Sequence, residues 1–180
     1  VWWTFKLFGH TKVGILNGGF PKWLYENLPV QKTINTRSRT NYKSKFNKKL
    51  VRNYQQVFDN IISKKEQVID ARSNGRFLGI EPEPRENIES GHIPGSLNLP
   101  FQELISDTNK TLKGLEEIEE IFKDKGITFE KPIVTTCGSG ITASILAFCL
   151  HLIGYMNYSV YDGSWTEWGT FKNHPSIRKN

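Results

Sequence analysis

Cys137 lies where an apolar stretch gives way to a loop of small residues. The stretch, residues 133–136, is typical of a buried strand, and a helical pattern begins near residue 142. In a strand–loop–helix unit, backbone N–H groups converge on the loop and the helix N-terminus favours negative charge. A cysteine at the mouth of such an anion cradle favours the thiolate and acts as a nucleophile. The predicted cradle consists of Gly138, Ser139, Gly140, Ile141 and Thr142.

The loop also limits the chemistry of the nucleophile. Cysteine phosphatases use a similar cradle but need an arginine in it, and residues 138–143 contain none. A sulfur carrier needs only a thiolate and amides that stabilise a persulfide. The other cysteine, Cys149, lies in an apolar helical pattern and fits the usual role of a small buried hydrophobe. No CxxC or His/Cys cluster indicates zinc, so we expect neither a metal nor an organic cofactor.

Strand and helix patterns alternate around this loop. A Gly- and Pro-rich stretch, residues 75–95, favours an irregular loop. Strands alternating with helices predict an α/β fold with a mainly parallel central sheet covered on both faces. The patterns predict strands at 67–72, 96–99, 133–136 and 158–161, and helices at 115–122, at 142–152 and after a capping box at 53–56.

A short internal repeat relates the two ends of the chain. Residues 7–23 match residues 152–168 without a gap, each with a glycine turn, an alternating strand, an Asn/Asp-Gly turn and a helix that bears Trp. In the first copy, the position equivalent to Cys137 falls before Val1. We therefore expect residues 1–30 to be the end of a first domain, 31–50 a linker and 51–180 a complete catalytic domain.

The net charge of +6 over 180 residues is concentrated in one stretch. Residues 31–65 hold ten basic side chains and one acidic one, whereas residues 66–180 are net negative. An arm that binds nucleic acid is the more specific interpretation of this stretch, but aromatic residues are sparse there and no recognition motif is visible. We therefore favour a linker and expect no nucleic-acid partner. No apolar run reaches the ~18 residues of a membrane span. We expect no membrane partner and a cytoplasmic protein, or a mitochondrial one in a eukaryote.

Together the motifs resemble the tandem-domain rhodanese/sulfurtransferase family. The resemblance covers the whole chain and implies a rhodanese-like fold, with most of an N-terminal rhodanese domain absent from these 180 residues. The family's mercaptopyruvate enzymes take a His and an Asp from that domain, so we expect the chain alone to transfer sulfur poorly or not at all. The motifs that carry the resemblance are residues 68–72, 75–77, 81–85, 91–96, 137–143 and 161–165.

Within the family, the loop resembles that of 3-mercaptopyruvate sulfurtransferases. Thiosulfate sulfurtransferases typically carry Arg-Lys where this chain has Gly138 and Ser139. The resemblance implies transfer of sulfur from 3-mercaptopyruvate through a Cys137 persulfide to a thiol acceptor such as thioredoxin, or to cyanide. A thiosulfate sulfurtransferase with an atypical loop and a non-catalytic rhodanese-like module are the alternatives.

The resemblance also implies roles for residues outside the loop. It places Arg76 and Arg85 at the mouth of Cys137 to bind the substrate, although either could instead pair with Glu81, Glu83 or Glu86. Ser139 either serves the substrate, by relaying a proton or binding its carbonyl, or makes only local hydrogen bonds. We expect structural roles for Arg72, His92, Asp162 and Trp165.

Overall fold

A five-stranded sheet forms the centre of the computed structural model, which describes residues 1–171 and 175–177. The strand order is β1-β5-β4-β2-β3, and every neighbouring pair is parallel. The predicted parallel α/β sheet is therefore confirmed. The strands are β1 (Val51–Arg52), β2 (Gln67–Asp70), β3 (Leu97–Asn98), β4 (Ile133–Thr136) and β5 (Tyr158–Tyr161).

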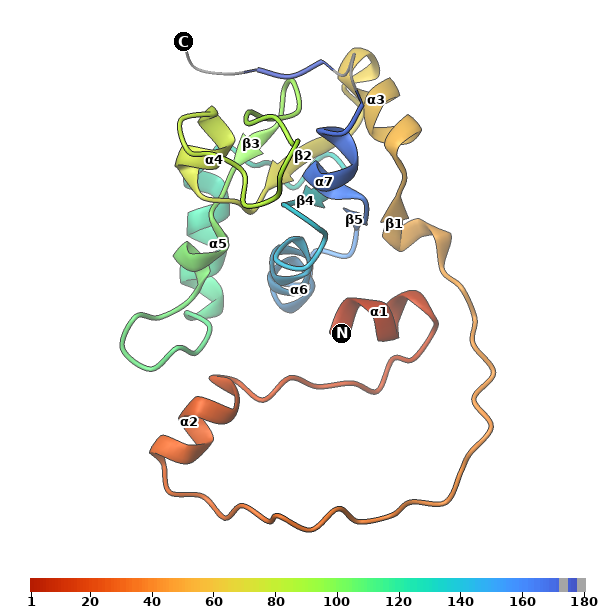
Figure 1. Ribbon diagram of the computed structural model, residues 1–180, viewed down its shortest axis with the longest axis vertical. Helices are drawn as coiled ribbons and strands as arrows, with labels where there is room; N and C mark the ends of the chain where they lie inside the picture. The colour runs from red at the N-terminus through yellow and green to blue at the C-terminus, as the bar shows by residue number, and fades with distance from the viewer. Residues whose placement is uncertain (172–174, 178–180) are drawn as a thin grey trace.

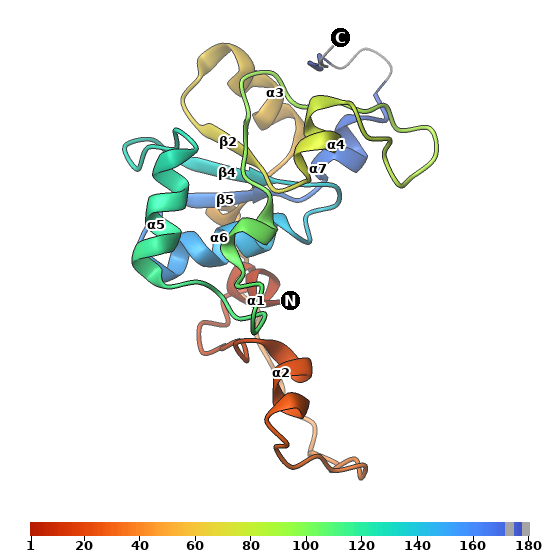
Figure 2. The same ribbon diagram turned by 90° about the vertical axis from the view of Figure 1, so that its left-hand side faces the viewer.

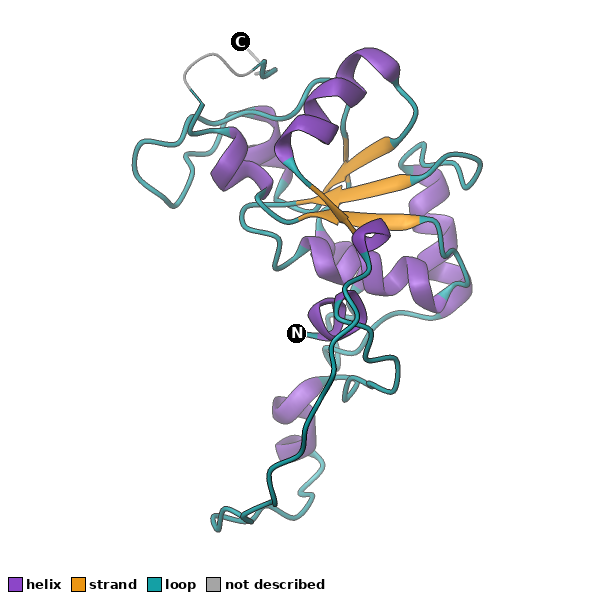
Figure 3. Cartoon of the chain, turned by 90° about the vertical axis from the view of Figure 1, so that its right-hand side faces the viewer, coloured by secondary structure: helices purple, strands orange, loops and turns teal. Residues whose placement is uncertain are grey.

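Helices cover both faces of this sheet (Figures 2 and 3). One face packs against α5 and α6, and the other packs against α3 and α7. The α-helices are α1 (Trp2–Leu7), α2 (Gly19–Tyr25), α3 (Tyr54–Ser63), α4 (Asn74–Leu78), α5 (Leu115–Asp124), α6 (Ala143–Leu152) and α7 (Ser164–Trp168). Two 3₁₀ turns, η1 (Lys48–Leu50) and η2 (Phe101–Leu104), complete the set.

The central strands are apolar on both sides because both sides are covered. Ile69 and Ile133 pack toward α5 and α6, while the neighbouring Val68 and Val134 pack toward α3 and α7. Successive side chains of a strand point to opposite faces, so a doubly covered strand becomes a continuous apolar run. This arrangement explains the runs from which the strands were predicted.

The predicted capping box starts α3. The Asn53 side chain accepts from the Gln56 N–H at 3.0 Å, and the Gln56 side chain accepts from the Asn53 N–H at 3.0 Å. These reciprocal bonds satisfy backbone donors that a helix start leaves free. The capped helix then leads into β2, which carries part of the candidate site.

Two predictions were wrong in detail. Residues 12–16 form no strand, because a strand needs a neighbour for its backbone groups and the described residues place none beside them. The equivalent strand β5 lies between β4 and β1. The predicted irregular stretch 75–95 begins within the short helix α4, whose N-terminus is capped by Ser73.

The N-terminal segment is fastened to the sheet domain. Trp2 and Trp3 of α1 are buried in the same cluster as α6, and Trp2 stacks edge-on against Phe148 at 4.8 Å. The Trp3 indole N–H donates to the Leu50 carbonyl at 2.9 Å. Between α2 and η1 the chain runs outside the body, as Figure 1 shows.

The division into 1–30, 31–50 and 51–180 stays a prediction. No helix among the described residues is long and apolar enough to cross a membrane.

Candidate active site

Three central strands deliver the candidate site to one edge of the sheet. The strands β2, β4 and β5 are parallel neighbours, so their carboxyl ends meet at the same edge. Asp70 ends β2, Cys137 directly follows β4 and Asp162 directly follows β5. The carboxyl edge of a parallel sheet is the usual place for a ligand site, and here it holds the predicted nucleophile.

Helix α7 orients the peptide groups of the Cys137 loop. The Trp165 N–H donates to the Cys137 carbonyl at 2.9 Å, and the Thr166 N–H donates to the Gly138 carbonyl at 2.9 Å. In a planar trans peptide the carbonyl and the following N–H point in opposite directions. The N–H groups of Gly138 and Ser139 therefore point away from α7.

The loop presents a row of free amide donors. Within the described residues, the backbone N–H groups of residues 138–142 donate to no protein acceptor. Gly140 makes the turn at φ +79°, and a Cβ there would lie 2.9 Å from the Asp162 carbonyl oxygen, so only glycine fits. A row of free N–H groups beside a cysteine forms the predicted anion cradle.

The two cysteines lie in different surroundings. Cys137 directly precedes the cradle and is 1% exposed. Cys149 lies on α6 inside the apolar core, where burial raises the pKa of its thiol to about 12. A thiol with so high a pKa stays protonated at neutral pH, which supports the structural role predicted for Cys149.

Arg76 lies on α4 and Arg85 lies in the irregular segment that follows it, and both arginines lie beside the cradle. A Cβ built on Gly138 would lie 3.0 Å from Nη2 of Arg76 and 3.9 Å from Nη1 of Arg85. Two guanidinium groups thus lie directly beside the loop that follows Cys137. A small anion seated there can reach positive charge and amide donors together.

Buried carboxylates compensate two of the nearby arginines. Glu83, whose side chain is 3% exposed, pairs with Arg72 at 2.7 Å and with Arg76 at 2.5 Å. Arg72 also pairs with Asp70 at 2.6 Å. Burial alone would lower the pKa of Arg72, but Asp70 and Glu83 more than offset that effect and hold the pKa above its ordinary value. This neutral network supports the structural role expected for Arg72.

Arg85 is held differently. It forms no ion pair with the described residues, and it donates one hydrogen bond, from Nη1 to Oγ1 of Thr166 at 3.0 Å. The carboxylate pairing that the sequence left open therefore occurs for Arg76 but not for Arg85. The sequence named Glu83 only as one of three possible partners, and it did not indicate Thr166. The Glu-Pro-Glu-Pro-Arg pattern holds two glutamates without showing which one turns inward, and no pattern marks Thr166.

The remaining predicted residues surround the cradle. Ser139 is half-buried, and its hydroxyl makes no hydrogen bond with the described residues, so the local bonding alternative is not seen. Ile141 is 74% exposed beside Thr142 at the start of α6. The His92 ring stacks on Phe77 at 3.8 Å, and its Nδ1 lies 2.7 Å from the Phe77 carbonyl, which supports a structural role.

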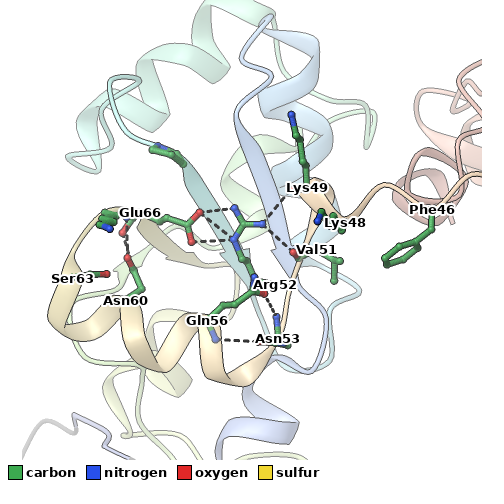
Figure 4. Close-up of a pocket in the computed structure, with 12 residues that line it drawn as sticks. Phe46, Lys48, Lys49, Val51, Arg52, Asn53, Gln56, Asn60, Ser63 and Glu66 are labelled. Atoms are coloured by element: carbon green, nitrogen blue, oxygen red, sulfur yellow. Dashed lines mark hydrogen bonds and ion pairs between the residues drawn. The ribbon is translucent and has the colours of Figure 1, made fainter.

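Other features of the surface are separate from this site. Within the part of the chain that the structure describes, no three His, Cys, Asp or Glu side chains gather to hold a metal ion. A cavity of about 880 Å³ lies beside β1 and α3, and it contains none of the predicted site residues. Figure 4 shows that Arg52 within it is bound by Glu66. This cavity adds nothing to the chemistry at Cys137.

Comparison with known proteins decides the family. A family model described as a rhodanese-like domain matches residues 54–170. The chain belongs to the rhodanese family. This match covers strands β2 to β5, the cradle, both arginines and α7, and it confirms the predicted rhodanese-like fold.

Curated and solved rhodanese relatives agree with this assignment. A mouse protein named 3-mercaptopyruvate sulfurtransferase is 43% identical over 169 residues, which cover 93% of this chain and 56% of the relative. A rat thiosulfate sulfurtransferase is 41% identical over 169 residues, or 93% of this chain and 57% of the relative. The chain thus spans just over half the length of these relatives.

Two solved rhodanese structures superimpose on most of the chain. Tum1 from Saccharomyces cerevisiae has a TM-score of 0.85 at 34% identity and covers 99% of this chain and 64% of its own. SseA from Escherichia coli, described as a 3-mercaptopyruvate sulfotransferase, has a TM-score of 0.78 at 34% identity and covers 91% and 60%.

Proposed function

We propose that this rhodanese domain carries sulfur from 3-mercaptopyruvate, through a persulfide on Cys137, to a thiol or to cyanide. The observation that carries the proposal is the cradle itself, in which a row of free N–H groups follows Cys137 and two guanidinium groups lie beside Gly138. Sulfurtransferases among the relatives, under both names, support the same reaction class.

In the first stage, the Cys137 thiolate attacks the sulfur of 3-mercaptopyruvate. A bond forms between the two sulfur atoms, the carbon–sulfur bond breaks, and its electron pair leaves on carbon as pyruvate enolate. The enolate takes a proton to become pyruvate, and we assign the relay of that proton to Ser139, whose hydroxyl makes no hydrogen bond with the described residues. The persulfide that remains on Cys137 is stabilised by the N–H groups of residues 138–142.

In the second stage, an acceptor thiolate attacks the outer sulfur of the persulfide. The sulfur–sulfur bond breaks, and its electron pair restores the Cys137 thiolate. A small thiol or a protein thiol such as thioredoxin then carries the sulfur away, and cyanide leaves as thiocyanate. No metal or organic cofactor enters this route.

The charge at the cradle favours a substrate with one negative charge. Arg76 is compensated by Glu83, whereas Arg85 has no carboxylate partner among the described residues. One uncompensated guanidinium matches the single carboxylate of 3-mercaptopyruvate, and Arg76 remains close enough to donate to its ketone.

Thiosulfate is the second candidate donor, because a relative that is 41% identical, against 43% for the mercaptopyruvate relative, is named for it. Thiosulfate is a dianion and is better matched by two uncompensated cations. The ratio of kcat/KM for the two donors separates the candidates. We expect the ratio to favour 3-mercaptopyruvate. A ratio that favours thiosulfate would make thiosulfate the assigned sulfur donor.

A non-catalytic module is tested by the reactivity of the thiol. We expect iodoacetamide at neutral pH to alkylate Cys137 in the folded chain while Cys149 stays unmodified. A Cys137 that is as inert as Cys149 would support a binding module and contradict the sulfurtransferase.

A further inference from the structure

Thr166 connects the cradle to the arginine that lacks a carboxylate partner. Its hydroxyl lies 2.5 Å from the Gly138 carbonyl oxygen and 3.0 Å from Nη1 of Arg85. Its backbone N–H also donates to the Gly138 carbonyl at 2.9 Å. The Thr166 side chain therefore contacts both the carbonyl of the Gly138–Ser139 peptide and the guanidinium of Arg85.

The direction of these hydrogen bonds is fixed by the groups involved. A hydroxyl has one proton to donate, a carbonyl can only accept, and a guanidinium can only donate. The Thr166 proton must therefore go to Gly138, and the hydroxyl oxygen must accept from Arg85. Such a chain of bonds has no alternative orientation, and each bond polarises the next.

A hydroxyl differs from a carboxylate in what it does to an arginine. Glu83 holds Arg76 in place and also cancels its charge. Thr166 holds Arg85 in place and leaves its charge intact. Arg85 lies in an irregular, exposed segment, and a free arginine side chain loses rotamer entropy on binding. Holding the side chain beforehand lessens that loss when a carboxylate binds.

We infer that Thr166 is a positioning residue, whose hydroxyl holds Arg85 over the cradle so that it captures the carboxylate of a 2-oxo acid. This inference rests on the proposed function, because it assigns a use to the same site. Thr166 acts through Arg85 and does not touch the reacting sulfur.

The position of the carboxylate determines which kinetic constant should change. The carboxylate of 3-mercaptopyruvate stays ionised and takes no part in the broken carbon–sulfur bond, so Arg85 binds ground state and transition state about equally. Losing such uniform binding raises KM and leaves kcat nearly unchanged. A general disturbance of the cradle would lower kcat instead.

The test uses Thr166→Val, which keeps the shape of the side chain and the backbone bond to Gly138 but removes the hydroxyl. In a chain that includes the first domain expected from the sequence, we expect KM for 3-mercaptopyruvate to rise about tenfold, with kcat within about twofold of the original. Thr166→Ser restores the hydroxyl and should return KM close to its original value. The unfolding midpoint in urea reports whether each variant is folded, and Thr166→Ala replaces the valine variant if it is not.

A binding measurement makes the test independent of turnover. Pyruvate carries the same carboxylate and ketone, and its binding is read as the concentration that halves the rate of Cys137 alkylation by iodoacetamide. We expect Thr166→Val to raise that concentration about tenfold as well. The matched control is Thr170→Val, since the Thr170 hydroxyl donates to the Glu167 carbonyl and does not contact Arg85.

A double-mutant cycle tests the route through Arg85. In an Arg85→Gln background, Thr166→Val should add no further loss of pyruvate binding, and an added tenfold loss would overturn the inference. Unchanged KM and pyruvate binding in Thr166→Val would also overturn it, while turnover by the original chain would leave the sulfurtransferase function standing. If a chain that includes the first domain expected from the sequence binds pyruvate through Thr166 but transfers no sulfur, the proposed function fails and the inference holds. A chain that does neither overturns both.

Discussion

At the residue scale, charge compensation separates the arginines around Cys137. Arg72 and Arg76 share the buried carboxylate of Glu83, while Arg85 is held by the neutral hydroxyl of Thr166. A buried ion pair is costly to break because the remaining partner is left uncompensated. The ion pairs of Glu83 therefore stabilise the segment that carries Glu83, and they set how much positive charge Arg76 presents to the substrate.

Glu83→Gln tests both consequences. Removing the carboxylate leaves Arg72 with Asp70 alone and frees the charge of Arg76. We expect a loss of about 3 kcal/mol in the free energy of unfolding, measured in urea. We also expect kcat/KM for the dianion thiosulfate to rise relative to that for 3-mercaptopyruvate. Glu86→Gln changes an exposed glutamate of the same loop and should alter neither quantity, so equal effects of the two substitutions would contradict the role of Glu83.

At the element scale, the sheet domain is completed by the N-terminal helix. Trp2, Trp3 and Leu7 of α1 are buried against α6, the helix whose N-terminus closes the cradle. Backbone bonds from Lys45 and Asn47 to the end of α1 then lead the chain into β1. The helix α1 therefore stabilises the face of α6 that lies away from the sheet.

Trp3→Ala should destabilise the chain by about 3 kcal/mol, because it removes a buried indole and its hydrogen bond to Leu50. The measurement is the free energy of unfolding in urea. Phe5→Ala on the same helix is the matched control, since Phe5 is 45% exposed and its removal should change stability by about 0.5 kcal/mol or less. Equal losses from the two substitutions would show that α1 does not pack as described.

The elements that were predicted correctly are those with a complete local signal. The capping box at Asn53 and the loop after Cys137 take their conformation from adjacent residues. The buried run 133–136 shows its strand in its own apolar pattern, and pairing with β2 and β5 completes that strand. The strand expected at 12–16 failed because a strand depends on a neighbour that the local pattern does not contain. The contact between Arg85 and Thr166 was missed for a similar reason, because the two residues are 81 positions apart in the chain. Glu83 was named only as one of three possible partners, since no spacing rule shows which glutamate of the irregular segment turns toward Arg72 and Arg76.

At the scale of the whole molecule, two histidines link stability to pH, the buried His92 and the half-buried His151. Burial lowers the pKa of His92, which stacks on Phe77. Burial and the nearby Lys6 also lower the pKa of His151, which packs against Trp2. The folded chain therefore binds protons less readily than the unfolded chain at these two sites, and stability must fall as the pH drops below the ordinary histidine value of 6.5.

We expect the urea midpoint to be lower at pH 5.5 than at pH 7.5. The double variant His92→Gln, His151→Gln should show a smaller drop over the same range, whatever its absolute stability. A midpoint that is constant, or that rises toward pH 5.5, would contradict the lowered pKa values of the two rings.

The most direct measurement of the central claim is the intact mass of the chain after treatment with 3-mercaptopyruvate. The proposed reaction predicts the addition of one sulfur atom, located on Cys137 by peptide mapping and removed by cyanide or a thiol. The Cys137→Ser variant should gain no sulfur, and Cys149→Ala should gain it as the original chain does. An adduct that persists in Cys137→Ser, or one located on Cys149, would contradict the account.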